Sequence, residues 1–261
     1  MIKAKKSLGQ NFLIDQNIID KIIDIVEIKD KSVLEIGPGT GNLTKNILKK
    51  KPKRLLVVEK DNDLVKFLSK NFDNQIKIIN DDILKIDENN LDTNILTVFG
   101  NLPYNISTEI LCKWILNIKD KHFWFDQLVL MFQKEVADRI IAKFNTKNYG
   151  RLSILSNWKL EIEKICDIKP SSFYPKPKID SSVLLLKPKL NFFPLNDPIN
   201  NPFPYVETKR RLFSILSPRN SISVTLTSNI PLFTCSHSGS SSLKFKDFQI
   251  PSSVPIITSP C

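Results

Sequence analysis

The chain has 261 residues, a formal net charge of +11, four cysteines and two histidines. This length is enough for one sizeable domain and a smaller one, and no apolar run approaches the roughly 20 residues that a membrane-spanning helix needs. The N-terminus lacks the apolar core of a signal peptide, and scattered cysteines with so few histidines argue against a zinc site. We therefore expect a cytoplasmic protein with no membrane span and no metal.

The positive charge is typical of proteins that bind nucleic acid. Lysine supplies 32 of the 38 basic residues, however, so a solvated lysine surface is an alternative explanation. Lys3, Lys5, Lys6 and the basic run at residues 49–54 are candidates for contacts with phosphates. The charge supports an RNA partner without establishing one.

The first predicted helix follows Asp15, a good N-cap, because isoleucines then recur at helical spacing through residues 18–23. After it, short apolar runs predict strands, and amphipathic segments between them predict helices. The predicted strands are residues 32–36, 54–59, 76–79, 95–99, 127–132, 160–166 and 181–186, and the predicted helices are residues 42–50, 61–70, 109–114, 133–143 and 150–158. This alternation predicts an α/β fold, a mostly parallel sheet with helices on both faces. Such sheets bind ligands beyond the carboxyl ends of their strands.

The composition and periodicity of the chain change near residue 188. Helical periodicity ends, and the last part of the chain is rich in Ser, Thr and Pro and poor in charge. Such a composition gives little drive to form a packed core. We therefore divide the chain into a domain of residues 1–188 and a C-terminal region of residues 189–261, which we expect to be poorly ordered.

A glycine-rich turn, Gly37-Pro38-Gly39-Thr40-Gly41, connects the strand at residues 32–36 to the following helix. A nicotinamide-dinucleotide site is the first alternative, but its fingerprint requires a third glycine where this chain has Asn42. The shorter spacing suits an adenosine cofactor without a pyrophosphate, such as S-adenosylmethionine. Glu59 ends the next strand, where a carboxylate can accept both ribose hydroxyls. Asp82 follows the third strand and can accept from the adenine amino group, or it can serve only as a helix N-cap.

The most informative segment is Asn101-Leu102-Pro103-Tyr104, at the end of the fourth strand. An amide oxygen and a neighbouring main-chain carbonyl can accept the two N–H groups of a planar amine. Pro103 fixes the turn, and the ring of Tyr104 offers a face on which a base can stack. Ordinary turn chemistry is the alternative for these four residues taken alone.

Three further segments occur in order with these motifs: Gly9-Gln10-Asn11-Phe12-Leu13, residues 133–139, and residues 173–181. Together the motifs resemble the KsgA-type small-subunit rRNA adenine dimethyltransferases over residues 5–188. The resemblance implies a class I, Rossmann-like methyltransferase fold that uses S-adenosylmethionine. The residues that it assigns to the cofactor pocket are Asn11, Leu13, Gly37, Gly39, Glu59, Asp82 and Asn101, with residues 10–13 covering the methionine.

The family's substrate is a pair of adjacent adenines in the 3′-terminal hairpin loop of small-subunit rRNA, each dimethylated at N6. The implied partner is this rRNA within the assembling 30S particle, and we expect a monomer. We hypothesise that Asn101 Oδ1 and the carbonyl of Leu102 or Pro103 accept the two N6 hydrogens. Phe173 is expected to stack on the flipped base opposite Tyr104, the alternative being a core phenylalanine.

Two other functions compete with this one. A large-subunit rRNA adenine methyltransferase of the macrolide-resistance type shares the fold, but Leu102 and the context of residues 9–13 favour the small-subunit family. A non-catalytic RNA-binding assembly factor is the second rival, and the intact motifs argue against it. The C-terminal region departs from the family's small helical domain, with residues 209–213 as its only candidate remnant; a shifted reading frame near residues 190–220 is one hypothesis.

Overall fold

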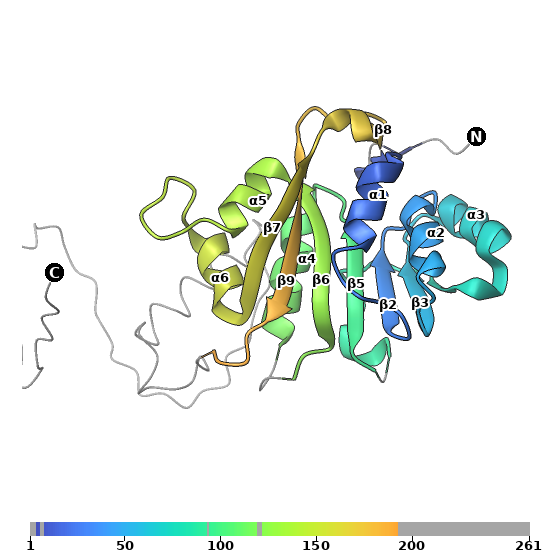
Figure 1. The fold of residues 1–261 in the computed structure, drawn as a ribbon, viewed down its shortest axis with the longest axis horizontal. Helices are drawn as coiled ribbons and strands as arrows, with labels where there is room; N and C mark the ends of the chain where they lie inside the picture. Colours follow the sequence, from blue (N-terminus) through green and yellow to red (C-terminus); the bar gives the residue numbers. More distant parts are fainter. Residues whose placement is uncertain (1–3, 6–7, 93, 119–121, 193–261) are drawn as a thin grey trace, which may run out of the picture. The chain divides into compact units, whose positions relative to one another are not determined.

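The structure is a computed structural model that describes residues 4–5, 8–92, 94–118 and 122–192. The predicted C-terminal region therefore lies outside the described residues except for its first four positions. A seven-stranded sheet forms the centre of the described part, in the order β4-β3-β2-β5-β6-β9-β7 (Figure 1). Its strands are β2 (Ser32–Ile36), β3 (Arg54–Val58), β4 (Lys77–Ile79), β5 (Leu96–Asn101), β6 (Phe125–Gln133), β7 (Leu160–Ile168) and β9 (Ser181–Pro188).

The sheet is mostly parallel, as the alternation of elements predicts. β2 pairs in parallel with β3 and β5, β3 with β4, and β5 with β6, whereas β9 runs antiparallel between β6 and β7. The carboxyl ends of β2, β3 and β5 consequently meet at one edge of the sheet. The predicted α/β class I fold is confirmed.

Six α-helices are described, and they cover both faces of the sheet. They are α1 (Gln16–Ile23), α2 (Asn42–Lys49), α3 (Asn62–Phe72), α4 (Ser107–Asn117), α5 (Lys134–Ile140) and α6 (Arg151–Lys159). Alternate strand residues point to opposite faces: Val33 and Val57 pack with α1 and α2, whereas Leu34 and Val98 pack with α4, α5 and α6. Figure 1 shows α1 in front of the sheet and α4 behind it.

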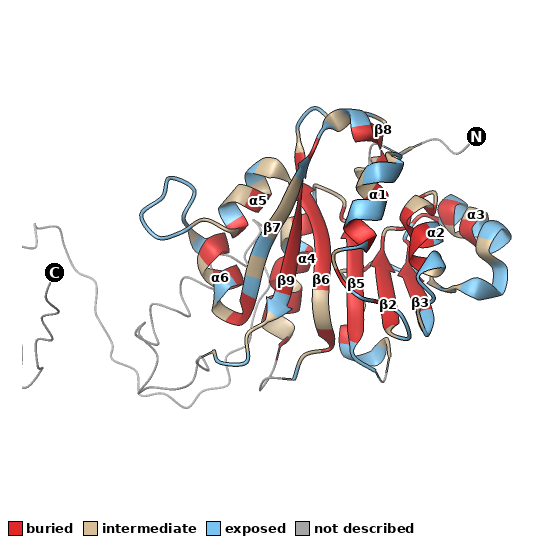
Figure 2. Ribbon diagram, viewed as in Figure 1, coloured by how far each residue is buried: buried red, intermediate tan, exposed pale blue. Residues whose placement is uncertain are grey.

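Local sequence explains where the elements begin and end. Asp15 caps α1 as predicted, since its side chain accepts hydrogen bonds from the backbone N–H groups of Asn17 and Ile18. The central strand β2 is buried along its whole length, whereas the edge strand β7 carries exposed residues (Figure 2). Among the described residues, no helix combines the length and apolar character that crossing a bilayer requires.

A second, two-stranded sheet was not predicted. β1 (Phe12–Leu13) pairs antiparallel with β8 (Phe173–Tyr174), with Phe12 opposite Tyr174 and Leu13 opposite Phe173. Strands of two residues are too short to show a hydrophobic period, so the sequence alone could not reveal them. The pairing fastens the N-terminal segment to a loop far along the chain.

Candidate active site

A cavity of about 220 Å³ lies at the carboxyl edge of the sheet. Every predicted site residue except Phe173 lines it: Asn11, Leu13, Gly37, Gly39, Glu59, Asp82, Asn101, Leu102, Pro103 and Tyr104. These residues come from segments far apart in the sequence, and the parallel strands bring them together. The structure thus places the predicted cofactor residues and the predicted amine-binding residues in one cavity.

The glycine turn forms one wall of this cavity. Gly37, Gly39 and Gly41 have φ angles of 64°, 58° and 78°, a region that favours glycine. A Cβ on Gly37 would meet only the Asn101 carbonyl oxygen within 4 Å, at 3.7 Å, so the turn leaves open space in front of this residue. A Cβ on Gly39 would lie 2.7 Å from Phe12 Cδ1, so this glycine lets the N-terminal segment approach closely.

Glu59 follows β3 and is buried, with 7% of its surface exposed. Its Oε1 accepts from the backbone N–H of Asp61 at 2.9 Å and its Oε2 from that of Gly39 at 3.3 Å. Burial raises the pKa of this carboxyl, although the backbone donors oppose the shift. Each oxygen keeps a second lone pair for a hydroxyl of a ligand.

Asp82 borders the cavity three residues after the end of β4. Its Oδ2 lies 2.7 Å from Lys60 Nζ, and its Oδ1 accepts from the backbone N–H of Leu84 at 3.0 Å. Burial raises the pKa of Asp82, but the hydrogen bonds from Lys60 and Leu84 outweigh it and leave the pKa below its ordinary value. Asp82 does not cap a helix, because residues 83–85 form a turn; its side chain caps this turn instead.

Lys113 on α4 holds the loop that begins with Asp82. Its ammonium group donates to the carbonyl oxygens of Ile83, at 2.8 Å, and Ile86, and to Glu88 Oε1 at 2.5 Å. The buried Glu88 also accepts from Trp114 Nε1 at 2.7 Å. The position of Asp82 therefore depends on α4, a link that sequence reasoning missed because Lys113 looks like an ordinary helix-surface lysine.

Asn101 and its neighbours form the opposite end of the cavity. Asn101 Nδ2 donates to the backbone oxygen of Asn11 at 2.7 Å, which fixes the amide plane and leaves Oδ1 as an acceptor. The Pro103 carbonyl already accepts from the backbone N–H of Ile106 at 3.1 Å. Within the described residues, no hydrogen bond reaches the Leu102 carbonyl, so this oxygen is the better second acceptor.

Tyr104 lines the cavity, and its hydroxyl lies 2.6 Å from Ser181 Oγ, which holds the ring. Phe173 does not face the cavity. It is 3% exposed and packs in the same core cluster as Leu13, its partner across the β1–β8 pair. The two-residue strand turns this side chain inward and leaves Tyr174 60% exposed. Stacking of Phe173 on a base stays a prediction.

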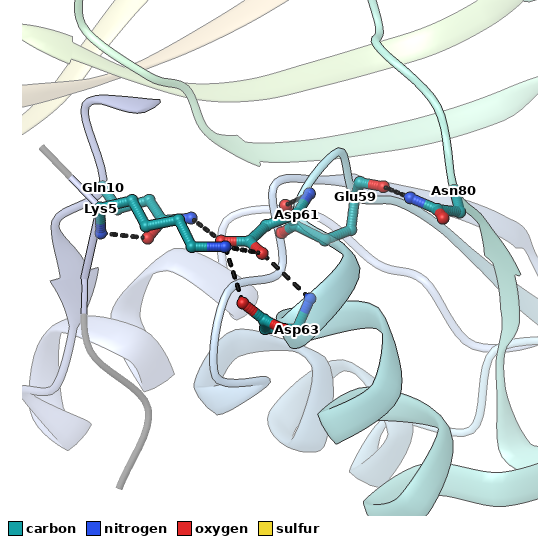
Figure 3. A network of polar contacts seen from close by, with 6 residues as sticks. All are labelled: Lys5, Gln10, Glu59, Asp61, Asp63 and Asn80. Carbon is teal, nitrogen blue, oxygen red and sulfur yellow. Dashed lines mark hydrogen bonds and ion pairs between the residues drawn. The ribbon is translucent and has the colours of Figure 1, made fainter. Parts of the chain in front are cut away.

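Residues 10–13, which we call the cover segment, form part of the cavity wall. Asn42 Nδ2 donates to the Leu13 carbonyl at 2.8 Å, and Asn101 Nδ2 donates to the Asn11 carbonyl at 2.7 Å. Figure 3 shows Gln10 and the nearby Lys5 bound to Asp61. Sequence reasoning missed the role of Asp61, whose only local signal is its place as the first residue of the predicted helix 61–70.

Three of the predicted phosphate-binding residues, Lys5, Lys50 and Arg54, are paired with carboxylates of the protein. Lys5 Nζ lies 2.6 Å from Asp61 Oδ1, so the predicted role of Lys5 in binding phosphates is not supported, while Lys3 and Lys6 lie outside the described residues. In the run at residues 49–54, Lys50 pairs with Asp24 at 2.6 Å and Arg54 with Asp92 at 2.7 Å. The run therefore offers less free charge than its composition suggests.

Glu35, in β2, also lines the cavity and is 1% exposed. Burial raises the pKa of its carboxyl to about 8, although Thr44 Oγ1 donates to it at 2.6 Å. The ordinary value is about 4.3, so the folded chain holds an extra proton between these two pH values. The resulting stability is present at acid pH and is lost as the pH rises toward 8.

Glu35→Gln should therefore flatten the dependence of stability on pH. We expect the melting temperature of the wild type to fall, relative to this variant, between pH 5 and pH 8. Thermal unfolding followed by circular dichroism at several pH values measures this difference. Glu163→Gln, at an exposed position of β7, is the control and should keep the wild-type slope; parallel slopes for wild type and Glu35→Gln would contradict the prediction.

Comparison with known proteins places these features in a family. Residues 1–198 match the family model for ribosomal RNA adenine dimethylase. A relative from Pelagibacter ubique (strain HTCC1062), named ribosomal RNA small subunit methyltransferase A, is 69% identical over 199 residues, which cover 76% of this chain and 76% of that protein.

Solved structures give the same fold. A dimethyladenosine transferase from Plasmodium falciparum is 33% identical with a TM-score of 0.61, and the similarity covers 68% of this chain and 63% of that one. The 23S rRNA methyltransferase ErmE is 25% identical with a TM-score of 0.60, and the similarity covers 70% of this chain and 71% of that one.

Proposed function

This chain belongs to the ribosomal RNA adenine dimethylase family, and we propose that it methylates N6 of two adjacent adenines in the 3′-terminal hairpin loop of small-subunit rRNA. It is an enzyme with a class I methyltransferase fold, and its methyl donor is S-adenosylmethionine. One observation carries the proposal: the glycine turn with Glu59 and the Asn101 corner are walls of the same cavity. The residues of the first wall would hold the methyl donor, and those of the second would hold the amine beside it.

The residues in the cavity fit the donor. Gly37 leaves space that a side chain would fill, and each Glu59 oxygen, with one backbone donor, keeps a lone pair that can accept from a hydroxyl group. We assign the ribose to Glu59 and the adenine amino group of the donor to Asp82. The methionine end is assigned to Asn11 and Leu13 of the cover segment.

The chemistry follows from the two acceptors at the Asn101 corner. An adenine N6 lone pair is delocalised into the ring, so the free amine is a weak nucleophile. Asn101 Oδ1 and the Leu102 carbonyl accept both N6 hydrogens, which favours a pyramidal nitrogen and directs its lone pair out of the ring plane. S-adenosylmethionine, when bound, supplies an electrophilic methyl group: the N–C bond forms as the C–S bond breaks.

Fixed dipoles stabilise the charge that develops in this step. The nitrogen would become positive as the methyl group arrives, and the two acceptor oxygens would stabilise this charge. The proton leaves for water after transfer, so no general base is needed. Tyr104, held by Ser181, supplies a stacking face, and alignment of nitrogen, carbon and sulfur supplies most of the remaining rate enhancement.

Small-subunit rRNA is favoured over large-subunit rRNA as the substrate. The relative with 69% identity carries a small-subunit name, whereas the 23S rRNA enzyme is 25% identical. A non-catalytic factor is disfavoured because Asn101, Glu59 and Asp82 keep an ordered arrangement around the cavity. We further propose that the chain acts as a monomer in the cytoplasm, on the assembling 30S particle.

We also propose that residues 1–188 are the methyltransferase domain, in keeping with a last described strand that ends at Pro188 and a family match that ends at residue 198. Residues 209–213, the candidate remnant of the helical domain, lie outside the described residues. Translating the other reading frames of the coding DNA tests the frame-shift hypothesis. Absence of a basic, helical continuation there would count against it.

Methyl transfer to purified subunits tests the proposed function. The full-length chain is incubated with labelled S-adenosylmethionine and either undermethylated small subunits or large subunits, and the modified nucleotides are identified by mass spectrometry. Dimethyladenosine at two adjacent positions of small-subunit rRNA is the expected result. Label on large-subunit rRNA, or binding to small subunits without transfer, would overturn the proposal in favour of one of its rivals.

A further inference from the structure

Asp61 joins the N-terminus to the loop after β3. It is 4% exposed, and each of its carboxylate oxygens has a partner from the N-terminal segment. Oδ1 lies 2.6 Å from Lys5 Nζ, and Oδ2 accepts from Gln10 Nε2 at 3.0 Å (Figure 3). Gln10 Oε1 in turn accepts from the backbone N–H of Lys5 at 2.7 Å. The three residues form a closed ring of contacts that includes Gln10, the first residue of the cover segment.

The same residue also fixes the carboxylate that we assign to the ribose. The backbone N–H of Asp61 donates to Glu59 Oε1 at 2.9 Å, and Asn80 Nδ2 donates to the Glu59 carbonyl at 3.0 Å (Figure 3). Asp61 therefore touches both ends of the cofactor site. Its backbone orients Glu59, and its side chain holds Gln10, the first residue of the cover segment.

The charge of Asp61 is maintained by this arrangement. Burial raises the pKa of its carboxyl, but hydrogen bonds from Lys5 and Gln10 outweigh the effect and leave the pKa below its ordinary value. The Lys5 side chain is 43% exposed, so the ion pair is open to screening by salt.

A purely structural role is the competing explanation. Asp61 is the N-cap of α3, because its Oδ1 also accepts from the backbone N–H of Asp63 at 3.0 Å. An N-cap alone requires no partner from the N-terminus. The contact with Lys5, across 56 residues of sequence, and the contact with Gln10 are unexplained by capping.

We propose that Asp61 is a positioning residue that closes the cover segment over S-adenosylmethionine through Lys5 and Gln10, and so sets how long the cofactor stays bound. This inference rests on the proposed function, since it takes the cavity to be a cofactor site. It adds a residue that controls cofactor retention and does not contact the reacting atoms.

Asp61→Asn is the most direct test. Asparagine is a good N-cap of nearly the same shape and keeps the backbone N–H that binds Glu59, but it removes the charge that holds Lys5. Binding of S-adenosylmethionine and S-adenosylhomocysteine to the full-length chain is measured by calorimetry without RNA, and dissociation by stopped-flow fluorescence. We expect about tenfold weaker binding from faster dissociation, as lost charged hydrogen bonds typically give. The KM for the donor should rise by more than the kcat falls.

Coupling between residues separates this role from capping. Lys5→Met should weaken cofactor binding as Asp61→Asn does, and the double variant should be no worse than either alone. Lys5→Arg should restore most of the affinity. Higher salt should weaken binding to the wild type and not to Lys5→Met. Asp63→Asn is the control. Asp63 is the second carboxylate paired with Lys5, and its own side chain is 67% exposed. This variant should change cofactor affinity less than threefold.

Two results would overturn the inference. The first is an Asp61→Asn variant with the cofactor affinity and dissociation rate of the wild type. The second is a double variant whose losses of affinity add up and whose melting temperature is lowered, because the loss of the N-cap alone would explain that result. A wild-type chain that binds neither S-adenosylmethionine nor S-adenosylhomocysteine would overturn the proposed function as well. The two failures are therefore distinguishable in one set of titrations.

Discussion

Asn101→Ala should lower the turnover number for adenine methylation by about 100- to 1,000-fold, the loss typical when one preorganised group at a developing charge is removed. The variant loses the acceptor for one N6 hydrogen, so the lone pair is no longer directed at the donor. Cofactor affinity should fall less than tenfold, because Glu59 and the glycine turn remain. Single-turnover methylation of undermethylated small subunits, with donor binding measured separately, tests both parts.

A matched change elsewhere controls for this result. Asn71→Ala removes an exposed asparagine on α3 that bonds only its own helix, and it should leave turnover unchanged. Asn101→Ala also loses the contact with Asn11, so its melting temperature must be compared with that of the wild type. Turnover within threefold of wild type in a folded Asn101→Ala chain would exclude the proposed role of the amide.

Glu59→Ala should weaken the binding of S-adenosylhomocysteine by about 100-fold or more, since hydrogen bonds to a charged group contribute roughly 1.5–3 kcal/mol each. The substitution removes both acceptors for the ribose hydroxyls and frees the N–H groups of Gly39 and Asp61. Glu59→Gln keeps one oxygen acceptor in a side chain of similar shape and should show an intermediate loss. Isothermal titration calorimetry gives the dissociation constants directly.

The exposed Glu27 provides the control for this pair of variants. Glu27→Ala should bind the cofactor product like the wild type. Circular dichroism must show that both Glu59 variants remain folded at the titration temperature. A folded Glu59→Ala chain with a dissociation constant within threefold of wild type would remove Glu59 from the cofactor site.

The fold was predictable because its main signals are local. The run at residues 32–36 is mostly apolar, is followed by a glycine-rich turn and is buried on both faces, and its predicted bounds match β2. The order of strands and helices then determines that the carboxyl ends of β2, β3 and β5 share one edge. The candidate site follows from that edge, which is why Gly37, Glu59 and Asn101 were found without a structure.

The remaining features depend on contacts between distant residues. The ion pair between Lys5 and Asp61 spans 56 positions and has no periodic signal. The burial of Phe173 was not predictable for a simpler reason: in a strand, a shift of one residue exchanges the inward and outward faces. The motif predicted an aromatic side chain facing the ligand, and the pairing with Leu13 places Phe173 in the core and Tyr174 at the surface.

A crystal structure of the chain with S-adenosylhomocysteine tests the central claim most directly, because it shows where the sulfur that carries the methyl group lies. We predict ribose hydroxyls bonded to Glu59, adenine beside Asp82, and the sulfur facing Asn101 Oδ1 and the Leu102 carbonyl. A sulfur atom directed away from these two oxygens, with the adenosine bound elsewhere in the cavity, would contradict the account.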